Sequence, residues 1–102
     1  MNQHAARFVV SNFIVQYAPN PSLAAGHIAV GYTVTKKIGG AVIRNRTKRR
    51  LREALRVCAS NKAKDGYHYV FIARHAILKS DFATLLRDME FAFSKIKVKQ
   101  GG

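Results

Sequence analysis

The chain has 102 residues, of which 18 are Lys or Arg and five are Asp or Glu, so its formal charge is +13 with histidine neutral. Apolar residues make up 48% of the chain, which is too many for a disordered basic tail and enough for the core of one small domain. A folded surface with so few acids attracts polyanions, and nucleic acid is the expected partner. The lone cysteine, Cys58, excludes a disulfide scaffold and a cysteine-based zinc site. No apolar run approaches the roughly 18 residues of a membrane span and the N-terminus lacks the layout of a signal peptide, so a cytoplasmic protein is expected.

Alternating β-branched and aromatic side chains indicate a first strand over residues 7–17. Two prolines then mark a loop, and clean alternation resumes in a second strand over residues 27–35. After a Gly-Gly break the apolar spacing becomes helical over residues 41–59; a third strand follows at 67–74 and a last helix at 81–97. The second and third strands flank a helix, which favours a parallel pair. The order predicts an α+β fold, a two-layer α/β sandwich in which helices pack on a small mixed sheet.

The two alternating sets of the second strand differ in character. The set that includes Tyr32 and Val34 is apolar and is expected in the core. The other set is small and weakly polar, so another molecule can approach that face closely; its members are Ala29, Gly31, Thr33 and Thr35. Ser80 is the expected N-cap of the last helix, whose apolar stripe from Phe82 to Ile96 is expected to pack in the core.

Residues 36–56 hold half of the 18 basic residues and one acid, Glu53. At 3.6 residues per turn, the basic side chains lie away from an apolar stripe of Leu51, Leu55 and Cys58. Each pair of like charges three or four residues apart costs the helix about 0.2–0.5 kcal/mol, so the arrangement favours a partner that supplies phosphates. Arginine binds phosphate oxygens in pairs, and the amide of Asn45 can bond a base edge or a 2′-hydroxyl. Two other interpretations of this basic helix are a solvent-exposed face and a helix that lies on a membrane surface. Solvent-exposed faces normally mix positive and negative charges, and a membrane-surface helix needs a wider apolar stripe.

The run RNRTKRRLRE at 44–53 resembles the RNR signature of the bacterial ribonuclease P protein subunit. The run GYTVTKKIG at 31–39 resembles that family's strand and turn, and YVFIAR at 69–74 resembles its later strand. The similarity extends over about residues 7–97, so residues 1–102 are expected to form a single RNA-binding domain. The family usually starts with a helix ahead of the first strand; only about six residues precede Arg7, so this helix is expected to be missing here.

The resemblance implies a protein subunit of ribonuclease P, which binds the catalytic RNA and the 5′ leader of precursor tRNA and supports endonucleolytic removal of that leader. Catalysis is expected in the RNA subunit with Mg²⁺, and the protein is expected to be an accessory subunit that binds no cofactor by itself and contributes no catalytic residue. The implied partners are ribonuclease P RNA and precursor tRNA; neither a membrane nor DNA is expected. The family fold also implies a left-handed βαβ crossover, against the general rule of right-handed crossovers.

The resemblance assigns two sets of residues. Those that match the family's catalytic-RNA face are Lys36, Lys37, Arg44, Asn45, Arg46, Lys48, Arg49 and Arg52. Those assigned to the cleft for the single-stranded leader are Tyr17, Thr33 and Ala73, together with Phe13, which shares the alternation face of Tyr17. An aromatic floor suits unpaired RNA because every base has a face to stack on.

The remaining polar residues do not indicate catalysis by the protein. The four histidines lack metal-ligand spacing and the five acids are scattered, so neither a metal site nor a pair for general acid–base work is predicted. The alternative function is a ribosomal or general RNA-binding protein of similar α/β fold without a processing role. The RNR helix together with the upstream Lys-Lys-x-Gly favours the ribonuclease P interpretation.

Overall fold

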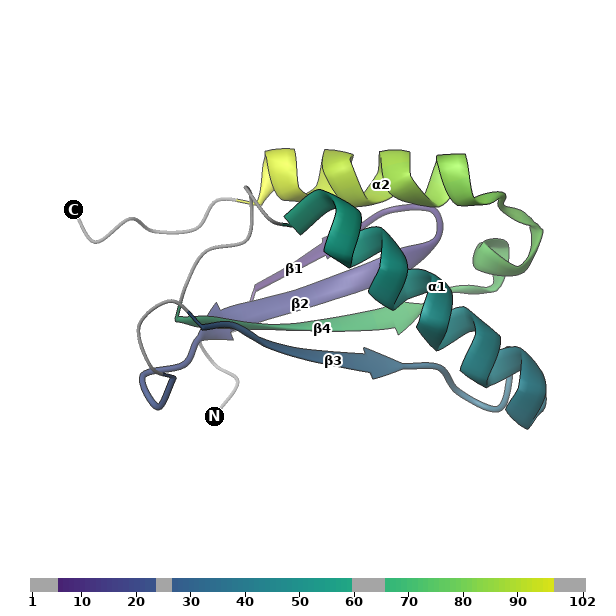
Figure 1. Cartoon of the computed structure of the whole chain (residues 1–102), viewed down its shortest axis with the longest axis horizontal. Helices are drawn as coiled ribbons and strands as arrows, with labels where there is room; N and C mark the ends of the chain where they lie inside the picture. The colour runs from purple at the N-terminus through teal and green to yellow at the C-terminus, as the bar shows by residue number, and fades with distance from the viewer. Residues whose placement is uncertain (1–5, 24–26, 60–65, 97–102) are drawn as a thin grey trace.

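The computed structural model describes residues 6–23, 27–59 and 66–96, which form a four-stranded sheet covered on one side by two α helices (Figure 1). The strands are β1 (Ala6–Val9), β2 (Phe13–Pro19), β3 (Ala29–Thr33) and β4 (Tyr67–Ala73). The helices are α1 (Ala41–Ala59) and α2 (Phe82–Lys95), and a short 3-10 helix, η2 (His75–Lys79), lies between β4 and α2. The predicted α+β class and the order of the predicted elements are confirmed. The prediction of a missing family helix ahead of the first strand concerns residues that lie outside the described ranges.

The strand order across the sheet is β1-β2-β4-β3. β2 pairs antiparallel with both β1 and β4, whereas β3 pairs parallel with β4, as predicted for strands that flank a helix. In Figure 1 both parallel strands run to the right, β4 lies above β3, and α1 crosses in front of the sheet. This path is a left-handed crossover, which confirms the family expectation and departs from the right-handed rule.

The core lies between the sheet and the two helices. Phe13 of β2 packs edge-on against Phe71 of β4, with ring centroids 5.5 Å apart. From α2, Phe93 meets the ring of Tyr69 edge-on, also at 5.5 Å, and from α1 the side chain of Leu51 is fully buried. Because both helices bury their apolar stripes on this face, the opposite face of the sheet carries neither of them.

The prediction of one continuous first strand is wrong, because the chain turns back to form the β1–β2 hairpin. Across this turn the N–H of Val10 donates to the carbonyl of Phe13 at 3.0 Å. Asn12 is fully buried in the turn; its Nδ2 donates to Asp88 Oδ2 on α2 at 2.9 Å, and its Oδ1 accepts from Ser80 Oγ at 2.7 Å. These bonds fix the turn, since a buried amide without partners would be costly.

The start of α2 also differs from the prediction. Asp81, and not Ser80, is the N-cap, because Oδ1 of Asp81 accepts the N–H of Thr84 at 2.9 Å. This hydrogen bond from the backbone holds the pKa of the Asp81 carboxyl below its ordinary value. α2 ends at Lys95, and the predicted extension to residue 97 lies outside the described residues.

A tight turn joins β3 to α1 and replaces the end of the predicted second strand. In this turn the N–H of Ile38 donates to the carbonyl of Thr35 at 3.0 Å, and the side chain of Ile38 is buried. A Cβ at Gly39 would lie 2.8 Å from Ile43, so the turn can pack this closely on α1 only with glycine there. The turn therefore brings the two preceding lysines next to the start of the helix.

Candidate nucleic-acid interface

α1 presents its apolar side to the sheet and its basic side outward. Leu51 is fully buried, and Leu55 and Cys58 are nearly so. Thr47 is also buried, with its Oγ1 donating back to the carbonyl of Ile43 at 2.9 Å. The predicted rotation of this helix is confirmed, and Ala54 is also fully buried on this side.

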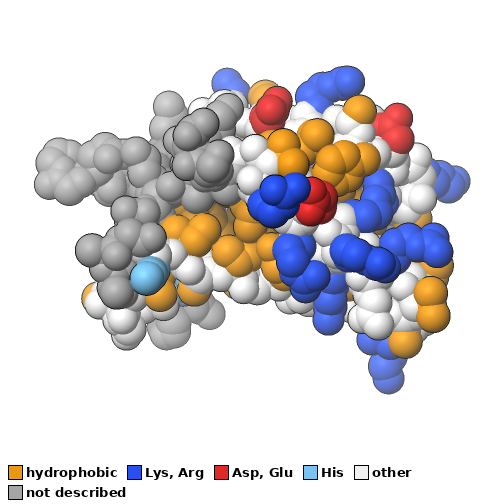
Figure 2. All heavy atoms as spheres, viewed as in Figure 1, with side chains coloured by type: hydrophobic (Ala, Val, Ile, Leu, Met, Phe, Trp, Pro, Cys, Tyr) orange, Lys and Arg blue, Asp and Glu red, His pale blue; other side chains and the backbone are white. Residues whose placement is uncertain are grey.

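The residues predicted to face the catalytic RNA lie along the outside of α1 and in the turn before it. The exposed members are Lys36, Lys37, Asn45, Arg46, Arg49 and Arg52. Arg44 and Lys48 are half-buried, and Nε of Arg44 is enclosed without a hydrogen-bond partner among the described residues. Figure 2 shows Lys and Arg side chains gathered over α1 with little acidic surface among them. The structure thus brings the predicted set onto one side of the molecule, and its role in RNA binding stays a prediction.

The one acid of α1, Glu53, forms an ion pair with Arg56 on the helix surface. The hydrogen bond from the Arg56 guanidinium lowers the pKa of the Glu53 carboxyl, and the same bond raises the pKa of Arg56. The pair removes Arg56 from the set of arginines that are open to an anion. It also leaves the other cations of α1 without an acidic partner within the described ranges.

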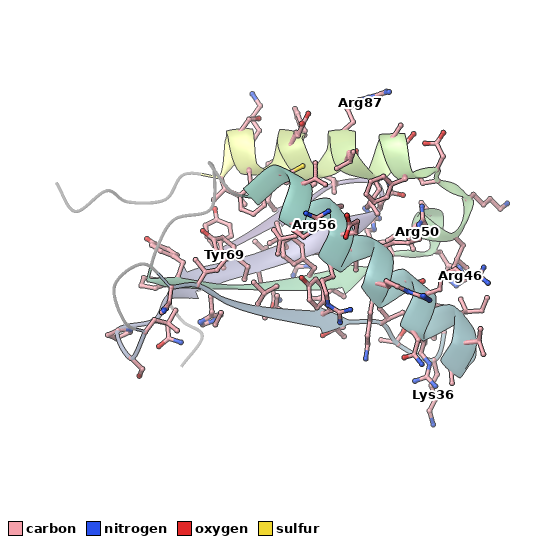
Figure 3. All side chains as sticks on the ribbon, in the orientation of Figure 1. Lys36, Arg46, Arg50, Arg56, Tyr69 and Arg87 are labelled. Atoms are coloured by element: carbon pink, nitrogen blue, oxygen red, sulfur yellow. The ribbon has the colours of Figure 1, made fainter. Side chains whose placement is uncertain are left out.

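Arg50 lies in the basic run of α1 but points toward the protein (Figure 3). Its Nη1 donates to the carbonyl of Ile77 at 2.9 Å, and its Nη2 donates to the carbonyl of Ser80 at 2.5 Å. These two bonds attach η2 and the segment before α2 to α1. Arg50 therefore stabilises the fold beneath the basic face and does not offer these donors to RNA.

Arg52 lies where α1 meets the edge of the sheet. Its Cζ stands over the ring of Tyr32 in β3, 5.5 Å from the ring centroid. Tyr32 is half-buried; burial raises the pKa of its hydroxyl, and the charge of Arg52 acts in the opposite direction. Of the exposed arginines of α1, Arg52 is the one that rests on an aromatic ring in the described structure.

The four residues predicted for the leader cleft do not share an open surface. The pairing register places Phe13, Tyr17 and Ala73 on the face beneath the helices and Thr33 on the opposite face. Phe13 is fully buried, Ala73 is buried, and Tyr17 is half-buried against Tyr69. The prediction that these residues form one cleft floor is therefore wrong, because the helices cover the more apolar face of β2 and β4.

The opposite face of the sheet, which we name the open face, consists of the alternate residues of all four strands. Its exposed or half-buried members are Arg7, Val9, Ile14, Gln16, Ala29, Gly31, Thr33, His68, Val70 and Ile72. Ala18, opposite His68, lies on the same face but is buried. The predicted approachable side of β3 is confirmed as part of this face. Sequence reasoning missed its β2 members, although Gln16 gave the signal: the polar member of an alternating strand normally points away from the core.

The described residues form neither a metal site nor a membrane-spanning helix. No three His, Cys, Asp or Glu side chains of the described residues lie close enough together to hold a metal ion. None of the described helices is long and apolar enough to cross a membrane. The basic face of α1 and the open face therefore remain the two candidate surfaces.

The fold and surface define a class of protein: a small basic α+β domain whose left-handed crossover helix exposes a row of cations. Among the described residues, Arg56 is the one cation of this helix in an ion pair. A family model described as ribonuclease P matches residues 1–97. The chain therefore belongs to the ribonuclease P protein family.

Two relatives show the extent of the likeness. The ribonuclease P protein component of Caulobacter vibrioides is 52% identical over 65 residues, which are 64% of this chain and 44% of that relative. The ribonuclease P protein component of Caldanaerobacter subterraneus is 42% identical over 87 residues, 85% of this chain and 72% of that relative. The chain thus spans less than half the length of the first relative.

Solved structures agree with the fold. The RNase P protein of Staphylococcus aureus superposes with a TM-score of 0.73 at 26% identity, covering 89% of this chain and 82% of that one. The RNase P protein of Thermotoga maritima superposes with a TM-score of 0.79 at 24% identity, covering 94% of this chain and 87% of that one. The second likeness is evidence for the fold alone.

Proposed function

We propose that this chain is the protein subunit of ribonuclease P, which binds the catalytic RNA and the 5′ leader of precursor tRNA and supports endonucleolytic removal of the leader. The observation that carries the proposal is the outer side of α1, where exposed basic residues follow one another and the one acid is already paired with Arg56. Membership of the ribonuclease P family supports it. The proposed location is the cytoplasm.

The outer side of α1 suits structured RNA, in which phosphates are dense. Arg46 and Arg49 are exposed and carry planar guanidinium forks that match pairs of phosphate oxygens. Asn45 can bond a 2′-hydroxyl or a base edge beside them. Lys36 and Lys37 add charge near the start of α1, where the helix dipole is also positive. Because each phosphate contact releases counterions, the affinity should fall steeply with salt.

The open face suits a single-stranded leader because neither α1 nor α2 covers it. Ile14 and Ile72 pair directly across β2 and β4 and offer apolar surface on which bases can rest. Gln16 and Thr33 add hydrogen-bonding groups on the same face. Arg7, paired with Gln16 across β1 and β2, supplies a cation for the leader backbone. We therefore place the leader on the open face and not on the buried side of the sheet.

Cleavage is proposed to take place in the RNA subunit, where Mg²⁺ stabilises the charge that develops at the scissile phosphate. The protein's part is electrostatic and positional. A domain of charge +13 between two RNAs reduces their mutual repulsion, so substrate binding needs less Mg²⁺. The open face then holds the leader next to the RNA that cuts it.

A competition measurement separates this function from general RNA binding. Affinity is measured for the ribonuclease P RNA of the same organism and for a ribosomal RNA fragment of equal length at the same salt concentration. We expect a preference of roughly tenfold or more for the ribonuclease P RNA, which corresponds to about 1.4 kcal/mol. Equal affinities would favour the alternative function of a general RNA-binding protein.

The leader surface is tested with a charge placed on the open face. Ile14→Glu should lower the ratio of precursor to mature tRNA affinity in the assembled holoenzyme, because a carboxylate there repels the leader backbone. The control is Val57→Glu, which adds the same charge at an exposed position of α1, on the other side of the sheet. If both variants keep the parent ratio, the open face does not bind the leader.

A further inference from the structure

The arginines of this protein differ in how their guanidinium groups are occupied. Arg50 and Arg74 donate hydrogen bonds to backbone carbonyls of the protein. Arg56 donates to the carboxylate of Glu53. Arg52 is occupied in another way, because its contact is the face of the ring of Tyr32. Within the described ranges, its N–H donors make no hydrogen bond to protein.

The ring beneath Arg52 is itself held in place. Tyr32 stacks on Phe71 with ring centroids 6.0 Å apart and planes 20° from parallel. Phe71 is fully buried, and it touches the rings of Phe13 and Phe93 as well. The stacked rings of Phe71 and Tyr32 therefore lead from the core to the surface, where the guanidinium of Arg52 stands over the ring of Tyr32.

The contact with Tyr32 leaves the N–H donors of the Arg52 guanidinium free to bind an anion. A guanidinium that is held over a ring by its charge uses none of its five N–H donors as hydrogen bonds to that ring. A free arginine loses much side-chain freedom when it binds a phosphate. The cation–π contact with Tyr32 already restricts the side chain of Arg52, so less freedom remains to be lost on binding.

We propose that Tyr32 is a positioning residue for RNA binding: its ring holds the guanidinium of Arg52 so that the N–H edge is presented to a phosphate of the RNA that α1 binds. The inference rests on the proposed function, since it names how one residue of that interface is oriented. It assigns a role to a strand residue that belongs to neither predicted RNA-binding set.

The test is a double-mutant cycle on the ribonuclease P RNA of the same organism. The affinities of the parent, Tyr32→Leu, Arg52→Ala and the double variant are compared at several salt concentrations. Tyr32→Leu should weaken binding about two- to fivefold, the range expected for loss of an exposed cation–π contact. In the Arg52→Ala background the same substitution should change nothing further, because the residue through which Tyr32 acts is absent.

Two more variants separate positioning from a structural role. Tyr32→Phe keeps an aromatic face and should retain most of the parent affinity. Tyr67→Leu is the matched control, since Tyr67 is also a half-buried strand tyrosine stacked on a core ring, that of Tyr69, without an arginine over it in the described structure. It should bind RNA as the parent does. If circular dichroism shows Tyr32→Leu to be unfolded, Tyr32→Ile, which suits an edge strand, takes its place.

The salt dependence gives a second readout. Loss of an oriented phosphate contact should make the log–log salt slope of Tyr32→Leu shallower, although its net charge is unchanged. An equal loss of affinity from Tyr32→Leu in both backgrounds, or parent-like affinity of Tyr32→Leu, would overturn the inference while leaving the α1 interface in place. If Arg52→Ala and Arg49→Ala each bind RNA as tightly as the parent, the proposed α1 interface itself is contradicted.

Discussion

Two adjacent arginines of α1 should give opposite phenotypes when each is replaced by alanine. Arg49 is exposed and has no partner among the described residues, whereas Arg50 donates to the carbonyls of Ile77 and Ser80. Arg49→Ala should therefore impair RNA binding and leave stability unchanged. Arg50→Ala should lower stability and, in the folded protein, leave most of the RNA affinity intact.

The magnitudes follow from the contacts. A hydrogen bond that involves a charged group contributes about 1.5–3 kcal/mol, and partial exposure reduces that value, so loss of both Arg50 bonds should cost about 2–4 kcal/mol of unfolding free energy. In a domain of this size that is a fall of at least about 8 °C in melting temperature. Loss of a phosphate contact at Arg49 should cost about 1–3 kcal/mol of binding, or about 5- to 150-fold in Kd, while its melting temperature stays near that of the parent.

The assay pairs urea unfolding, followed by circular dichroism, with RNA titration at several salt concentrations. Arg49→Ala should also make the log–log salt slope shallower by about 0.7–0.9, the value for one contact. Arg50→Lys serves as an intermediate, because a single ammonium cannot bridge the two carbonyls in the manner of a guanidinium. Suppose that Arg50→Ala has the same free energy of unfolding in urea as the parent and loses RNA affinity as Arg49→Ala does. The assignment of Arg50 to the fold is then refuted.

Three further predictions concern the scaffold. Leu51→Ala should cost about 2–5 kcal/mol in urea unfolding, since its side chain is fully buried; a melt like that of the parent would mean that α1 packs with another face. Asn12→Ala should cost about 2–4 kcal/mol because it removes the buried amide that donates to Asp88 and accepts from Ser80, although the backbone N–H of residue 12 still donates to Asp88; adding Asp88→Ala should cost less than the sum of the two single changes. Asp81 has a lowered pKa, so its contribution to stability is present above its ordinary pKa of 3.8 and is lost as the pH falls through the lower folded value. Asp81→Asn keeps the cap without titrating, so the urea midpoint of the parent should fall more than that of the variant between pH 5 and pH 2; parallel curves would show that the cap does not titrate in this way.

The prediction of α1 succeeded because its information is local. Apolar residues at helical spacing and the Gly-Gly break identified residues 41–59, and the structure has the same bounds. The same spacing identified the buried side, with Leu51, Leu55 and Cys58 inward. Side chains on the other side of the helix face solvent, so their exposure followed directly from the same pattern.

The predictions that failed depend on contacts between distant segments. The turn at Asn12 is fixed by Asp88 and Ser80, which are 76 and 68 residues away, and an apolar run of strand-forming residues gave little sign of it. Alternation showed that Phe13 and Tyr17 share a face, but the identity of the covered face depends on where the helices pack. Arg50 reads as one more cation in a basic run, because its carbonyl partners belong to a segment that follows β4.

The family resemblance predicted the handedness of the crossover, which neither the hydrophobic pattern nor residue propensities could predict. The general rule for parallel strands predicts a right-handed crossover, and this chain has the left-handed one that the family implies. The resemblance was less useful for the leader cleft, where a shift of one residue along β2 moves every side chain to the other face. Gln16 and Tyr17 are neighbours in sequence, and only the first lies on the open face.

The most direct test of the proposed function is leader cleavage at a Mg²⁺ concentration too low for the catalytic RNA alone. Precursor tRNA is incubated with the ribonuclease P RNA of the same organism, without protein, with the parent chain, or with a variant that carries both Arg46→Ala and Arg49→Ala. We predict that the parent restores cleavage at the mature 5′ end, and that the double variant does so only at a much higher protein concentration, because the α1 contacts to RNA are weakened. The proposed function would be contradicted if the parent failed to restore cleavage. It would also be contradicted if the parent and the double variant were equally active at limiting protein concentration.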